Sequence, residues 1–232
     1  MTIRKFFTLT TILFAAFSFV SCSSDDDDDE NKNDAVADKH EYVDLGLPSG
    51  TLWATCNVGA SKPEEFGDYF AWGEIEPKET YEPENYKWSN DNCETFTKYC
   101  TNSRYGNVDN NLELLPEDDT ATANWGSNWC TPSRDQFNEL KNSAYTTIEQ
   151  TTQNGVKGVK ITSKKNGKTL FFPDAGDRWY DNFSITGDGT YWTRSVEETD
   201  SHTGYVVDLY AGGWGLRLRA IGYPVRPVRS SK

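Results

Sequence analysis

The chain has 232 residues, of which 36% are hydrophobic and 14% aromatic, and its formal net charge is -13. This length suffices for one domain with a sizeable core, and eight Trp, twelve Tyr and twelve Phe supply its apolar area despite a mean hydropathy of -0.73. The negative charge argues against nucleic acid as a partner, because phosphate binding relies on Lys and Arg.

The N-terminus has the pattern of an export signal. Arg4 and Lys5 precede an apolar run, residues 6–20, that is too short for a bilayer span of about 20 residues. The run leads into Cys22, in a context that resembles the lipobox of bacterial lipoproteins. We therefore expect residues 1–21 to be a cleaved signal peptide and Cys22 to carry acyl chains such as palmitate, which anchor the protein in the outer membrane. An ordinary secretory signal with an incidental cysteine is the alternative.

An acidic stretch follows the lipidation site. Residues 25–30 are all Asp or Glu and resemble the acidic tag that directs Bacteroidetes lipoproteins to the outer cell surface. A solvated spacer is the alternative, because a run of like charges repels itself and stays extended. We expect residues 22–40 to form a lipidated tether and residues 41–232 to form the folded domain.

The first part of the domain predicts short strands and then a long loop. Residues 42–45 and 52–54 form two predicted strands around a turn at residues 48–50. Residues 67–74 predict an aromatic strand between two glycines. Residues 77–115 show neither a strand period nor a helix period, and a loop of this length is normally functional or held by local packing.

The middle of the domain predicts a helix and a three-stranded meander. One helical turn is expected over residues 119–124. Ser133 and Gln136 have the spacing of a capping box, so an amphipathic helix is expected over residues 133–142. Asn-Gly pairs at 154–155 and 166–167 favour type I′ turns. The meander strands are residues 146–153, 156–164 and 168–172.

The last third predicts further short strands with Gly-rich connections, namely residues 191–195, 205–210, 216–220 and 225–228. The fold class predicted from these elements is α+β and mainly β, with one or two short helices, antiparallel short strands and long irregular loops.

Several motifs carry a resemblance to a known family. They are VDLGLPSGTLWA at residues 43–54, NVGA at 57–60, GDYFAWGE at 67–74, ATANWG at 121–126 and GYPVRPVR at 222–229. Together they resemble the Fibrobacter succinogenes major paralogous domain family, which is abundant in surface lipoproteins of gut Bacteroidetes. That family is similar in turn to C-type-lectin-like and formylglycine-generating-enzyme-like folds. The resemblance implies a C-type-lectin-like domain whose irregular loops carry binding, and it implies no shared catalytic activity.

One aromatic and polar cluster is the candidate ligand-binding site. Flat rings beside Asn, Asp and Arg suit sugar stacking or protein recognition, because rings give a large contact area at low entropy cost. Strand alternation predicts that only one of Tyr191 and Trp192 is buried. The candidates are Arg178, Trp179, Tyr180, Asp181, Asn182, Trp192, Arg194, Tyr210 and Trp214.

Four cysteines remain after lipidation, an even number in an oxidising compartment. Cys93 and Cys100 are close enough in sequence to form a disulfide across the long loop, with free buried thiols as the alternative. Their spacing is not that of a zinc site. No cofactor or metal is expected, although four aspartates offer oxygen atoms to calcium without an EF-hand spacing, namely Asp174, Asp177, Asp181 and Asp188.

The motifs favour a protein without catalytic activity. The two histidines lie in polar stretches without a nucleophile motif, and no reactive cysteine pair lies after residue 130. Carboxylates are plentiful, but their separation decides whether a glycosidase pair exists. We predict a binding or adhesion module for a glycan or protein ligand. The alternatives are a structural or assembly subunit of a surface complex and, third, a glycoside hydrolase.

Overall fold

A computed structural model describes residues 39–184 and 189–230 of the chain. The predicted signal peptide, the lipidation site Cys22, the tether up to residue 38 and the calcium candidate Asp188 lie outside the described residues. The chain from Lys39 onward is one compact unit. None of its described helices combines the length and the apolar character that a membrane span requires.

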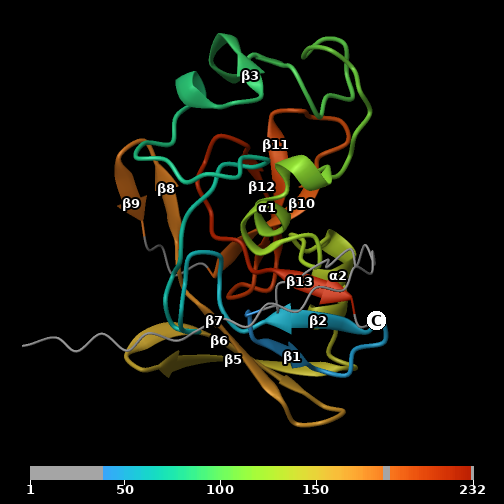
Figure 1. The fold of residues 1–232 in the computed structure, drawn as a ribbon, viewed down its shortest axis with the longest axis vertical. Helices are drawn as coiled ribbons and strands as arrows, with labels where there is room; N and C mark the ends of the chain where they lie inside the picture. Colours follow the sequence, from blue (N-terminus) through green and yellow to red (C-terminus); the bar gives the residue numbers. More distant parts are fainter. Residues whose placement is uncertain (1–38, 185–188, 231–232) are drawn as a thin grey trace, which may run out of the picture. The chain divides into compact units, whose positions relative to one another are not determined.

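The two ends of the domain meet in one small sheet. Strands β1 (Tyr42–Asp44), β2 (Thr51–Ala54) and β13 (Val228–Ser230) lie in the order β1-β2-β13, and both pairings are antiparallel (Figure 1). The predicted opening hairpin is therefore confirmed. Trp53, at the centre of β2, is completely buried, and the predicted last strand begins at Val228 instead of residue 225.

The predicted helix is confirmed as α2 (Arg134–Lys141). Its capping box is complete, because the Gln136 amide donates to Ser133 Oγ at 3.2 Å and the Ser133 amide donates to Gln136 Oε1 at 2.9 Å. Phe137 and Leu140 are fully buried and join the core formed by Trp53, Val159, Phe172 and Tyr191. The apolar face of α2 thus connects the terminal sheet with the meander.

The predicted meander is confirmed as β5 (Thr146–Gln153), β6 (Val156–Ser163) and β7 (Thr169–Pro173), paired in that order. Its first turn has φ 48° at Asn154 and φ 85° at Gly155, as a type I′ turn requires. The second turn is different. Only Gly167 has a positive φ there, and a connection of five residues replaces the predicted two-residue turn, because the Gly167 amide bonds back to Ser163 O.

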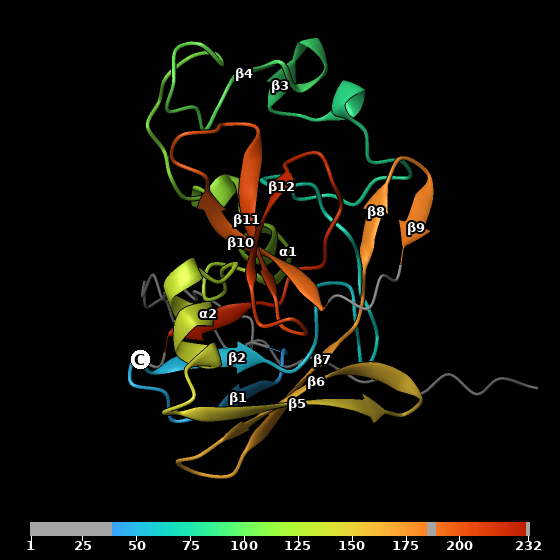
Figure 2. The ribbon, with the colours of Figure 1, turned by 180° about the vertical axis from the view of Figure 1, so that it is seen from behind.

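A third sheet contains β10 (Thr190–Val196), β11 (Thr203–Asp208) and β12 (Trp214–Leu218) in the order β10-β11-β12. Both views place this sheet beside α2, whereas the hairpin of β8 (Asp177–Trp179) and β9 (Asn182–Ser184) lies on the side away from α2 (Figure 2). The predicted alternation in β10 is wrong, because Tyr191 and Trp192 are both buried. The two faces of β10 contact different core clusters, so both rings are covered.

The segment 67–74 is not the predicted strand. It forms one isolated bridge, Phe70 to Tyr223. Residues 69–74 are buried, and packing into two core clusters replaces ladder pairing. The predicted irregularity of residues 77–115 is confirmed. Its short elements are η1 (Pro83–Asn85), β3 (Ser89–Asn90), η2 (Asp91–Cys93) and β4 (Thr95–Phe96). The 3₁₀ turn η3 (Pro116–Asp118) and α1 (Thr120–Trp125) follow, and α1 is the predicted helical turn.

The long loop is held by a buried arginine. Arg219 is 0% exposed, and its guanidinium carbon lies 4.0 Å from the centroid of the Phe96 ring. Its Nη1 donates to the carbonyl oxygens of Lys98 and Tyr99 at 3.3 and 3.2 Å. Burial lowers the pKa of this side chain. The loop is therefore fixed by packing and by contacts to one side chain from the end of β12.

Candidate ligand-binding site

The structure separates the predicted binding residues into three places. Arg178 and Trp179 lie on β8, Tyr180 and Asp181 form the tip of the hairpin, and Asn182 begins β9, so these five residues are together (Figure 2). The other four lie elsewhere in the fold. The β8–β9 hairpin with its neighbours is therefore the candidate site, and it is called the hairpin site below.

The tip of the hairpin has an unusual backbone. Tyr180 has φ 55°, in the left-handed region that residues with a bulky side chain rarely adopt. Two backbone hydrogen bonds hold it there, from the Tyr81 amide to Tyr180 O at 3.0 Å and from the Tyr180 amide to Tyr81 O at 2.7 Å. The Tyr180 ring is 43% exposed and packs edge-on against Trp179, with 5.0 Å between ring centroids. Such backbone strain is concentrated at functional sites.

Arg178 lies between two aromatic rings beside this tip. It is paired across the hairpin with Phe183, and its guanidinium carbon lies 5.1 Å from the Tyr69 ring centroid and 5.3 Å from that of Phe183. Phe183 is 42% exposed. Within residues 39–184 and 189–230, no carboxylate forms an ion pair with Arg178. Its planar donors are therefore available to a ligand next to an exposed ring.

A small pocket of about 190 Å³ lies against the hairpin. Its wall contains two tyrosine rings and side chains of both charges, namely Asp68, Tyr69, Lys78, Glu79, Tyr81 and Arg178. Its lining is thus mainly charged, and such groups beside two aromatic rings can fix the orientation of a polar ligand.

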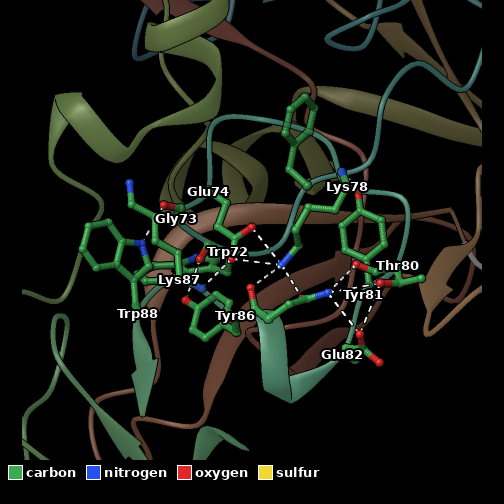
Figure 3. Close-up of polar contacts among 12 residues, drawn as sticks. Trp72, Gly73, Glu74, Lys78, Thr80, Tyr81, Glu82, Tyr86, Lys87 and Trp88 are labelled. Atoms are coloured by element: carbon green, nitrogen blue, oxygen red, sulfur yellow. Dashed lines mark hydrogen bonds and ion pairs between the residues drawn. The ribbon is translucent and has the colours of Figure 1, made fainter.

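A buried carboxylate fixes Lys78 at this pocket (Figure 3). Glu74 is 6% exposed, and its Oε2 lies 3.0 Å from Lys78 Nζ, while its Oε1 accepts from the Lys87 amide at 2.8 Å. Lys78 Nζ also donates to Asn85 Oδ1 at 2.8 Å. The charge of Lys78 is thus largely satisfied within the protein. Of the two cations in this lining, Arg178 is the one that forms no ion pair with the described residues.

The two tyrosines of the pocket are fixed by backbone carbonyls. Tyr81 Oη donates to Tyr69 O, and Tyr69 Oη donates to Ala175 O. Burial raises the pKa of both phenols, so both remain neutral donors at neutral pH. Gly222 allows this arrangement, because a Cβ at that position would lie 2.8 Å from the Tyr81 ring. The wall of the pocket is therefore preformed.

Two further predicted binding residues lie on β12 and in the β11–β12 turn instead. Trp214 Nε1 donates to Asn138 Oδ1 at 3.1 Å, and Lys141 Nζ lies 4.8 Å from the Trp214 ring. Tyr210 is in the β11–β12 turn, where its carbonyl accepts from Gln150. These rings belong to a different surface from the hairpin site.

Trp192 and Arg194 are not part of the hairpin site. Trp192 is a core residue, 2% exposed, whose Nε1 donates to Phe70 O at 2.8 Å, so its prediction as a ligand-binding residue is wrong. Arg194 Nε lies 2.9 Å from Glu113 Oε2, and this ion pair joins β10 to the end of the long loop. Trp192 and Arg194 therefore stabilise the fold around β10 and do not contribute to the hairpin site.

The predicted disulfide between Cys93 and Cys100 is absent, since both are free thiols, as are Cys56 and Cys130. Cys93 Sγ lies 3.8 Å from Pro83 O, whereas the buried Cys100 Sγ lies 3.2 Å from Asn102 O, so the two thiols face different neighbours. Burial raises the pKa of the Cys93 thiol. In the described ranges no group of three or more His, Cys, Asp or Glu side chains is placed to hold a metal ion.

Sequence reasoning missed Tyr69, Lys78, Tyr81 and Phe183 as site residues. Phe183 lies in the same hairpin, so a strand prediction over residues 177–184 would have paired it with Arg178. The other three come from residues 69–81, and only the tertiary structure brings them to the hairpin. Comparison with known protein families, curated proteins and solved structures found no match for this chain.

Proposed function

We propose that the domain is a non-catalytic binding module of a surface-exposed lipoprotein, and that the hairpin site binds a glycan. The observation that carries the proposal is the strained tip that exposes Tyr180 two residues after Arg178, which forms no ion pair within residues 39–184 and 189–230. Sugar rings present flat apolar faces and many hydroxyl groups. Exposed Tyr180 and Phe183 would cover such faces, while Arg178 and Asn182 would bind hydroxyl or carboxylate groups.

The proposal also covers the cellular location of the protein and the family to which it belongs. The pattern around Cys22 and the acidic tether support anchoring in the outer membrane with exposure to the outside. The motifs support membership in the major paralogous domain family with its C-type-lectin-like fold, and the mainly β structure with two short α-helices and long loops is compatible with such a fold. Binding needs neither a cofactor nor a metal in this proposal.

The test is a glycan array probed with a soluble form of the protein, residues 22–232 with Cys22→Ser, in the presence and absence of EDTA. Saturable binding that is unchanged by EDTA is expected. Tyr180→Ala and Phe183→Ala should each weaken binding at least tenfold, which corresponds to about 1.4 kcal/mol. Tyr145→Ala is the matched control, because Tyr145 is 37% exposed and lies in the turn before β5.

The outcomes distinguish the candidate functions. Binding that survives both hairpin variants would contradict the hairpin site. Absence of binding to every glycan would contradict the sugar ligand and favour a protein ligand or an assembly role. Release of reducing ends during incubation would instead support the glycoside hydrolase alternative.

A further inference from the structure

A pocket of about 420 Å³ lies where the start of α2 meets β10 and β11, and it is called the α2 pocket below. It shares no lining residue with the pocket of the hairpin site. Backbone hydrogen bonds join three segments around it. The Arg194 amide donates to Pro132 O at 3.0 Å, and the Val196 amide donates to Leu112 O at 3.0 Å. The walls of the α2 pocket are therefore fixed by the fold.

Arg134, the first residue of α2, places an unpaired cation in this lining. Its guanidinium carbon lies 3.7 Å from the centroid of the Tyr205 ring, so the ring holds the side chain in place. Within residues 39–184 and 189–230, no carboxylate pairs with Arg134, and its buried Nε has no hydrogen-bond partner. A planar guanidinium in this state is suited to bind a carboxylate.

Two carboxylates of the lining are unpaired as well. Asp135 and Glu198 are exposed, and neither forms an ion pair in the part of the chain that the structure describes. The third carboxylate, Glu113, is already neutralised, because its Oε2 lies 2.9 Å from Arg194 Nε. The α2 pocket therefore offers one positive charge beside Tyr205 and two negative charges at its exposed mouth.

We propose that the α2 pocket binds a short zwitterion, either a free amino acid or a short peptide. The ligand carboxylate would contact Arg134, and the ligand ammonium group would contact Asp135 and Glu198. A ligand that carries only negative charge would be repelled by the two carboxylates, and one that carries only positive charge would be repelled by the arginine. A zwitterion avoids both repulsions, and the volume lies within the roughly 300–1,000 Å³ that is usual for ligand pockets.

The test titrates four probes into the soluble form of the protein, namely leucine, the dipeptide Gly-Leu, N-acetyl-Gly-Leu and Gly-Leu amide. Gly-Leu should shift the amide NMR signals of Ser195 and Val196, which line the pocket, and leave those of the β8–β9 hairpin unchanged. Acetylation or amidation removes one charge each and should weaken binding at least tenfold. Leucine and Gly-Leu carry the same two charges at different separations, so the tighter binder identifies a free amino acid or a peptide as the ligand.

Protein variants supply the matched comparison. Arg134→Gln should weaken Gly-Leu binding at least tenfold. Asp135→Asn combined with Glu198→Gln should do the same, and this variant should bind N-acetyl-Gly-Leu more tightly than the wild-type protein does, because the repulsion of its carboxylate is removed. Glu84→Gln combined with Glu94→Gln changes the net charge equally at exposed positions outside the lining and should leave all affinities unchanged.

Three results would overturn the proposal. The first is that neither leucine nor Gly-Leu binds, and the second is that all three forms of Gly-Leu bind equally. The third is that the variant without Asp135 and Glu198 keeps the wild-type preference for Gly-Leu over its acetylated form. The acidic positions are exposed, so this comparison stays valid even if Arg134→Gln destabilises α2.

Discussion

Substitutions at Tyr180 test whether the hairpin tip is strained. With φ 55°, any residue that has a Cβ carries a left-handed penalty of about 1–2 kcal/mol, which glycine avoids. Glycine loses about 0.5–1 kcal/mol more backbone entropy on folding than alanine. Tyr180→Ala and Tyr180→Gly both remove the ring and its contact with Trp179, so that loss cancels in the comparison. Tyr180→Gly should therefore be the more stable variant, by about 0.75 kcal/mol.

The control position should give the opposite sign. Tyr145 is exposed to a similar degree but does not have a positive φ. There Tyr145→Gly should be less stable than Tyr145→Ala by about 0.5–1 kcal/mol. Urea denaturation at equal protein concentration measures both differences, and thermal midpoints should move by about 2–4 °C per kcal/mol in a domain of this size.

Binding measurements on the same Tyr180 variants separate the ring from the backbone. Both variants lack the ring, so both should lose glycan binding even though their stabilities differ. If Tyr180→Gly is less stable than Tyr180→Ala by the amount seen at position 145, the tip is not strained and the reasoning fails. If one variant keeps full binding, the exposed ring does not contact the ligand.

Three further predictions concern the long loop and the thiols. Arg219→Met should destabilise the domain less than Arg219→Ala by about 2 kcal/mol in chemical denaturation, because Met keeps much of the packing against Phe96 and avoids a large cavity. Equal losses of unfolding free energy in the two variants would show that the charge of Arg219 matters more than its packing. Burial alone would raise the pKa of Asp109, but amides at Tyr99, Asn111 and Cys100 outweigh it and hold the pKa below 3.8. The ionised form thus stabilises the fold above pH 3.8, and this contribution is lost as pH falls through the lowered pKa. The difference in unfolding free energy between the wild-type protein and Asp109→Asn should therefore shrink over that range. Alkylation of the unreduced, denatured soluble form, followed by mass spectrometry, should modify all four of its cysteines, and protection of a pair would reveal a disulfide.

Local patterns predicted those elements whose signals lie within a few residues. The capping box at Ser133 and the Asn-Gly turn at 154–155 each specify a backbone conformation directly. Residues 67–74 misled the same reasoning, because an aromatic segment that packs into two core clusters has the composition of a strand without its pairing. Trp192 was predicted as a binding residue for a similar reason. Because both faces of β10 are buried, its side chains do not alternate between core and solvent, and no ring on it is marked as exposed.

The candidate site could be predicted only in part, because half of it comes from another region of the chain. Arg178 to Asn182 are neighbours in sequence, so their cluster was visible. Tyr69 and Tyr81 reach the hairpin through backbone bridges, Phe70 to Tyr223 and Tyr81 to Tyr180, that no local pattern indicates. Arg219 was equally hidden, since an arginine beside a strand end is ordinarily a surface residue.

The segment from Arg219 to Tyr223 connects the end of β12 with the long loop and the hairpin site. It leaves the end of β12, bonds to the long loop through Arg219, pairs with Arg178 through Gly222 and with Phe70 through Tyr223. The glycine at 222 lets the Tyr81 ring lie against it, which places Tyr81 under the hairpin tip. Residues 219–223 therefore tie the hairpin site to the end of β12 and to the long loop.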